Sequence, residues 1–92
     1  MQDVKERCPE VDGAVLFGSL ARGDAVPGSD ADVLVFLKSS ATPFHQRFVR
    51  YMPRGLAIGV DLFAYTHNEL EGMHAAGNSF IARALREGID LL

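Results

Sequence analysis

The chain has 92 residues, of which 48% are hydrophobic and 23% are charged, and its formal net charge is −3. This length and composition are typical of a single globular domain spanning residues 1–92, and they exclude a catalytic domain joined to a separate substrate domain. The negative charge makes nucleic acid a poor candidate partner, because binding to phosphates favours a basic surface.

The first half of the chain alternates apolar runs with residues that favour loops. The pattern predicts a short helix over residues 1–7 and a buried strand over 14–17. Residues 18–29 contain three Gly and one Pro, which predicts a loop with one helical turn. The clearest strand is predicted over 31–37, where β-branched and aromatic residues are apolar on both faces.

The second half predicts helices around a third strand. Thr42 followed by Pro43 suits an N-cap and the first residue of a helix over 43–52. Residues 56–65 then form an apolar run, broken only by Asp61, that predicts a strand.

Capping signals mark the last elements. Thr66 and Glu69 have the spacing of a capping box, so a helix should begin near residue 67. Gly77-Asn78 should end it, Ser79 should cap a final helix that ends at Gly88, and residues 89–92 could add a short strand. The predicted fold is therefore α/β (α+β), a small mixed sheet of three to four strands packed against helices.

Cysteine content and hydropathy favour a cytoplasmic protein. Cys8 is the only cysteine, so the chain forms no disulfide with itself and suits a reducing compartment. The first ten residues are polar and lack the apolar core of a secretory signal. No apolar run approaches the roughly 20 residues that span a bilayer.

Asp30 and Asp32 lie two residues apart at the start of the strand predicted over 31–37. Side chains with this spacing point to the same face of a strand, so the two carboxylates should lie close together. Like charges at short distance repel, and a divalent cation removes the repulsion. Mg²⁺ is commonly held by one or two carboxylates together with substrate phosphates.

Asp61 interrupts the run AIGVDLFAY, where an unpartnered charge would be costly to bury. If its strand lies beside that of Asp30 and Asp32, three carboxylates would suit a site for two metal ions roughly 3.5–4 Å apart. One ion would activate an attacking hydroxyl and the other would hold a triphosphate.

Gly18 and Ser19 follow a predicted strand directly. Glycine allows the backbone to approach a phosphate, and a strand-to-helix turn aims N–H groups at an anion. Arg22 lies three residues further on, within reach of the same phosphate. Each pattern alone has a simpler explanation: a loop, a turn capped by Asp30, or an Asp61 at a solvated edge. Their combination favours a nucleotide site.

The stretch GSLARGDAVPGSDAD resembles the signature of the polymerase-β-type nucleotidyltransferase superfamily, and in detail its minimal nucleotidyltransferase (MNT) branch, which is often encoded beside a HEPN-domain partner. The closing ARALREGIDLL is similar to the last helix and strand of that branch. Asp61 falls where a third carboxylate is expected. The matching motif residues are Gly18, Ser19, Arg22, Gly23, Ser29, Asp30 and Asp32.

The resemblance implies Mg²⁺-dependent transfer of a nucleoside monophosphate, with AMP from ATP as the first choice, to a hydroxyl of a HEPN-domain protein. Asp30, Asp32 and Asp61 would then bind two Mg²⁺ ions, and Asp61 could instead take the proton of the acceptor. The phosphate side would be formed by Gly18, Ser19, Arg22 and Ser29. Two alternatives stay open: an antitoxin that binds its partner without catalysis, and a transferase of the antibiotic-modifying kind.

Other polar and aromatic residues are given structural interpretations. His45, His67 and His74 share no ligand spacing and are expected on the surface. A basic stripe with helical spacing is expected on a solvated face, with a partner or nucleotide contact as the alternative; it comprises Arg47, Arg50 and Arg54. Packing roles are expected for Tyr51, Met52, Tyr65 and Met73, with stacking on a base as the alternative for the two tyrosines. Cys8 is expected to be inert.

Overall fold

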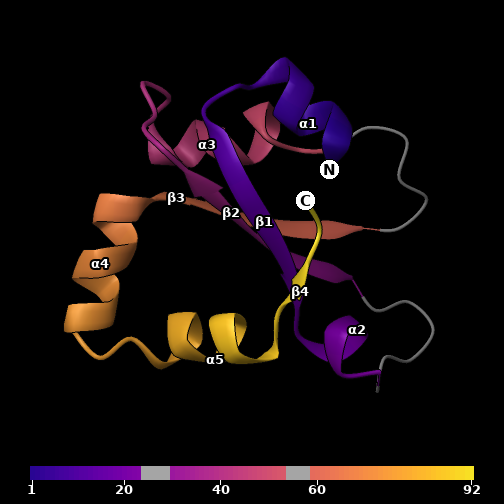
Figure 1. Cartoon of the computed structure of the whole chain (residues 1–92), viewed down its shortest axis with the longest axis vertical. Coiled ribbons are helices and arrows are strands. Elements are labelled where there is room, and N and C mark those ends of the chain that lie inside the picture. The colour runs from indigo at the N-terminus through magenta and orange to yellow at the C-terminus, as the bar shows by residue number, and fades with distance from the viewer. Residues whose placement is uncertain (24–29, 54–58) are drawn as a thin grey trace.

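A computed structural model of the chain describes residues 1–23, 30–53 and 59–92 (Figure 1). Helices and strands alternate along this part of the chain up to α4, which is followed by a second helix. In order they are α1 (Gln2–Arg7), β1 (Val11–Phe17), α2 (Ser19–Arg22), β2 (Ala31–Leu37), α3 (Phe44–Arg50), β3 (Val60–Thr66), α4 (His67–Ala75), α5 (Ser79–Glu87) and β4 (Ile89–Asp90).

The strands form one mixed sheet in the order β3-β2-β1-β4. β1 runs antiparallel to both β2 and β4, whereas β2 and β3 are parallel. Consequently the C-terminal end of β1 lies at the same end of the sheet as the N-terminal ends of β2 and β3. The predicted α/β fold with a small mixed sheet is confirmed.

Each face of the sheet carries an apolar core. Alternation along β2 sends Val33 and Val35 to one face and Leu34 to the other, and all three are buried. The first core includes Val4 of α1 and Tyr51, which follows α3. The second core is covered by α4 and α5, which Figure 1 shows on the lower left, away from α1 and α3 at the top.

Two predicted helix starts are wrong by one residue. The N-cap of α3 is Pro43 rather than Thr42, and the helix ends at Arg50. The N-cap of α5 is Asn78 rather than Ser79, because the Asn78 side chain accepts hydrogen bonds from the backbone N–H groups of Phe80 and Ile81. An amide oxygen caps as well as a hydroxyl does, so the spacing alone did not separate the neighbours.

Of the other predicted features, some agree with the structure and some differ from it. The capping box of Thr66 and Glu69 is present, and β2 has its predicted bounds. β1 begins at Val11 rather than residue 14, because Val11 and Gly13 also pair with β2, on either side of a bulge. The helix α4 ends at Ala75, and Gly77 follows with a φ of 77°. Its N–H donates to the His74 carbonyl and the N–H of Asn78 donates to the Met73 carbonyl, which together form a Schellman motif. The first residues of the strand predicted over 56–65 lie outside the described part.

Arg47 is not on a solvated face, so that prediction is wrong for this residue; Arg54 lies outside the described residues. Only 7% of Arg47 is exposed, because α3 turns it towards β3. Its guanidinium donates to the Thr42 and Ala64 carbonyls at 3.1 and 3.2 Å and to Glu69 Oε1 at 2.6 Å. Burial opposes ionisation of Glu69, but the bonds from Arg47 and Thr66 outweigh it and lower its pKa.

Substituting Glu69→Gln removes the charge that faces Arg47. We expect the free energy of unfolding at pH 7 to fall by about 1–3 kcal/mol, measured by urea denaturation, because a charge-assisted bond to a buried cation is lost. Partial exposure of Glu69 keeps the loss below that of a fully buried pair.

The same pair predicts a pH dependence. Because the pKa of Glu69 lies below its ordinary 4.5, its stabilisation is complete above that pH and is lost as pH falls through the lowered pKa. The difference between wild type and variant should therefore shrink in acid. Equal stabilities at pH 7 would contradict the assignment.

Candidate functional site

Three carboxylates lie at one end of the sheet because of the pairing of β2 with β3. Asp32 is directly opposite Asp61 in the parallel register. Asp30, one residue before β2, has the same orientation as Asp32 because side chains two apart share a face. This is the face that α4 and α5 cover further along, since Leu34 belongs to the second core.

The electrostatics of the site show mutual repulsion. Asp30 and Asp61 are exposed, whereas Asp32 is partly buried. The pKa of Asp32 is raised, first by burial and then by the charges of Asp61 and Asp30, while Arg22 acts in the opposite direction. Asp32 is therefore close enough to Asp61 and Asp30 to sense their charges.

The donor chemistry of this acidic site suits Mg²⁺, since carboxylate oxygens are its preferred protein ligands. Within residues 1–23, 30–53 and 59–92, however, no three His, Cys, Asp or Glu side chains gather closely enough to surround one ion. The strands bring the three aspartates to one end of the sheet without closing them around a single point. The number of ions expected from the sequence stays a prediction.

Two glycines hold the backbone against these carboxylates. Gly18 has a φ of 77°, and a Cβ there would collide with Asp32 Oδ2. A Cβ on Gly59 would collide with Asp30 Oδ1. The sequence indicated Gly18 as a phosphate contact but did not indicate Gly59. The only feature that could have drawn attention to Gly59 is its position two residues before Asp61.

The phosphate-side residues predicted from the motif are only partly described. The backbone of Ser19 opens α2, while its side chain and all of Ser29 lie outside the described part. Arg22 ends α2 and forms an ion pair with Glu87 of α5 at 3.1 Å. The ion pair ties the turn that follows β1 to the last helix.

A pocket of about 410 Å³ opens beside Asp32, between the sheet and α5. Its lining residues are Phe17, Gly18, Arg22, Asp32, Ser79, Phe80 and Arg83. The residues from α5 were missed, because a sequence does not show which face of a helix meets a pocket. The only sequence feature that could have indicated them is the four-residue spacing of Ser79 and Arg83, which places both on one face of a helix.

An aromatic cluster underlies this pocket. Phe80 of α5 packs edge-on against Phe17 at 5.3 Å and against Phe63 at 5.1 Å between ring centroids. Phe17 lies opposite Asp32 in the sheet, and Phe63 follows Asp61 by two residues. The rings therefore fix α5 relative to the strands that carry the acids.

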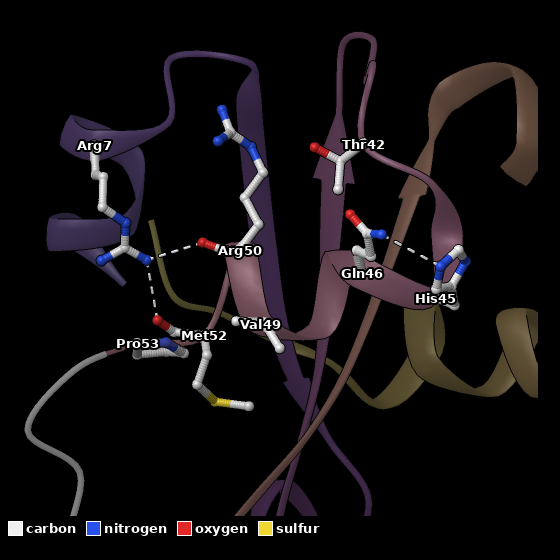
Figure 2. Close-up of a pocket in the computed structure, with 8 residues that line it drawn as sticks. All are labelled: Arg7, Thr42, His45, Gln46, Val49, Arg50, Met52 and Pro53. Atoms are coloured by element: carbon white, nitrogen blue, oxygen red, sulfur yellow. Dashed lines mark hydrogen bonds between the residues drawn. The ribbon is translucent and has the colours of Figure 1, made fainter.

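A second cavity, of about 810 Å³, lies between α1 and α3 (Figure 2). Its cations are already bound to protein acceptors. Arg7 donates to the carbonyls of Arg50 and Met52, as Figure 2 shows. Arg50 pairs with Glu10 at 2.8 Å. These contacts hold α1 to α3, which makes a structural role the better explanation.

The remaining residues mostly follow the predictions. Tyr51 and Cys8 are buried, and Met52 and Met73 pack against the two cores. The exposed His67 contacts Asp12 at 2.9 Å. Among the described residues, no helix is both long and apolar enough to cross a membrane.

Comparison with known proteins shows the family to which the chain belongs. The sequence matches the nucleotidyltransferase domain model over residues 1–76. A search of curated proteins found no match. Among solved structures, the chain is similar to a proposed nucleotidyltransferase of Sulfolobus solfataricus, with 26% identity and a TM-score of 0.58. The alignment covers 77% of this chain, which spans 64% of that protein's length.

Gly18→Ala should be more harmful than the matched change Gly23→Ala. Both glycines have a positive φ, 77° and 80°, but a Cβ meets Asp32 only at position 18. We expect about 1–2 kcal/mol of lost stability for Gly23→Ala from backbone strain alone, and more for Gly18→Ala. Thermal unfolding measures both, and equal losses would show that position 18 does not pack against Asp32.

Asp32→Asn should raise the melting temperature at neutral pH. Because the pKa of Asp32 is raised in the fold, its ionised form opposes folding at neutral pH, and this cost disappears in acid. The difference between variant and wild type should therefore be present at pH 7 and absent near pH 3. Calorimetry at both pH values, with and without Mg²⁺, is the measurement. A variant less stable than wild type at pH 7 would contradict crowding of the carboxylates.

Proposed function

We propose, because the chain belongs to the nucleotidyltransferase domain family, that it transfers a nucleoside monophosphate from an NTP, with ATP as the first choice, to a hydroxyl of another molecule. The observation that carries this proposal is the parallel register that sets Asp32 opposite Asp61, with Asp30 two residues before Asp32. Oxygen of the acceptor forms a bond to the α-phosphorus, and the bond to the leaving pyrophosphate breaks.

In this proposal Asp30, Asp32 and Asp61 hold divalent cations, Mg²⁺ by preference and two by the number of carboxylates. Bound Mg²⁺ would neutralise triphosphate charge and lower the pKa of the attacking hydroxyl. Asp61 is exposed at the edge strand β3, so its carboxylate can accept the proton of a hydroxyl that arrives from outside.

The triphosphate is assigned to the β1 side of Asp32, where Gly18 lies, rather than to the β3 side, where Asp61 lies. The turn at Gly18 and Ser19 would present backbone N–H groups to the phosphates, with Arg22 and Ser29 beside them. The backbone at Gly18 lies close to Asp32, which supports placing the phosphates beside the metal ligands. Positioning and charge neutralisation would supply most of the rate acceleration.

We propose a HEPN-domain protein as the acceptor, which would make this chain the antitoxin of a HEPN/MNT pair. The support is the resemblance of GSLARGDAVPGSDAD to the minimal nucleotidyltransferase branch. A second support is apolar surface on α3, where Phe44, Phe48 and Val49 are 52%, 48% and 76% exposed. Such a patch is typical of a surface that a partner covers.

The same patch favours a second candidate function, an antitoxin that silences its partner by occlusion without chemistry. In that case Phe48 and its neighbours on α3 would carry the function, and the aspartates would be dispensable. The two candidates therefore differ in which residues matter.

Incubation with ATP labelled at the α-phosphate, Mg²⁺ and the HEPN-domain partner should place label on the partner. Asp32→Asn should reduce labelling at least about 100-fold, because charge stabilisation at the reacting phosphate is lost. The matched control is Asp90→Asn, which removes an exposed carboxylate from β4 at the opposite side of β1 and should label normally. A partner that is silenced but unlabelled would favour occlusion instead.

A further inference from the structure

We propose that Arg83 of α5 binds the β- and γ-phosphates of the nucleotide, an assignment that rests on the proposed nucleotidyl transfer. Arg83 lines the pocket of about 410 Å³ beside Asp32. The match to the nucleotidyltransferase domain model covers residues 1–76 and ends before α5. The assignment of Arg83 therefore rests on the geometry of the pocket.

The charges around the pocket are separated by sign. Asp32 lies on the sheet side of the pocket, where the carboxylates would hold a cation and, through it, the α-phosphate. Arg22 and Arg83 contribute the positive charges of the lining. A metal–triphosphate complex has the complementary arrangement, because its outer phosphates extend away from the metal ligands and need cations of their own.

The two arginines differ in their partners. Arg22 forms an ion pair with Glu87 at 3.1 Å. In residues 1–23, 30–53 and 59–92, Arg83 makes no hydrogen bond or ion pair. Its guanidinium therefore has N–H donors to offer a ligand, and its planar fork suits phosphate oxygens.

The helix that carries Arg83 is firmly placed. Ile81 and Ala84 are 1% and 0% exposed in the second core, and Asn78 caps the helix start. Phe80 contacts the rings of Phe17 on β1, which lies opposite Asp32, and of Phe63 on β3, the strand of Asp61. A cation on a helix fixed in this way needs little reorganisation to meet developing charge on the pyrophosphate.

The test compares nucleotide binding by wild type, Arg83→Ala and the matched variant Arg86→Ala. Both arginines are exposed on α5, but only Arg83 lines the pocket. Displacement of a fluorescent ATP analogue in the presence of Mg²⁺ gives the affinities for ATP and AMP without a need for turnover. Thermal unfolding confirms that both variants fold.

We expect Arg83→Ala to weaken ATP binding about tenfold or more while AMP binding changes less than about twofold. Arg86→Ala should leave both affinities near those of wild type, and Arg83→Lys should be intermediate. If wild type binds ATP and Arg83→Ala behaves like Arg86→Ala, the role of Arg83 is overturned while nucleotidyl transfer stands. If wild type binds no nucleotide, both proposals fail.

Discussion

The parallel pairing of β2 with β3 is the constraint on which the candidate site depends. It sets Asp32 opposite Asp61, while the i, i+2 rule adds Asp30 on the same face. Three negative charges are thereby held at one end of a small sheet. The ionised form of Asp32 opposes folding in this position, because burial and then the charges of Asp61 and Asp30 raise its pKa. Such a cost is typical of sites whose arrangement serves a ligand.

The rest of the fold holds this end of the sheet in place. Gly18 and Gly59 let the backbone lie against the carboxylates, and a Cβ at either position would require the side chain of Asp32 or Asp30 to shift. The aromatic contacts of Phe80 join α5 to β1 and β3, and the ion pair of Arg22 with Glu87 joins the turn after β1 to that helix. The acids, the turn and the pocket therefore form one connected unit.

Local patterns were sufficient to predict the strand of Asp32 and the capping box at Thr66, because neighbouring residues decide such features. The site residues Asp30, Asp32 and Asp61 were also indicated, since a charge in an apolar strand is visible in the sequence. Arg47 was wrongly predicted on a solvated face, and Arg83 was not indicated by the sequence. One is buried and the other lines a pocket, and each outcome depends on which face of a helix packs against the sheet. Such packing depends on residues distant in the chain.

The central claim is that the three aspartates act together as a cation site. Carboxyl ¹³C NMR of the protein with a non-hydrolysable ATP analogue, titrated with Mg²⁺, tests it most directly. We expect the signals of Asp30, Asp32 and Asp61 to shift together and to saturate at the same Mg²⁺ concentration, while the signal of Asp90 on β4 stays constant. Signals of the three aspartates that do not respond, or that respond only as Asp90 does, would contradict the account.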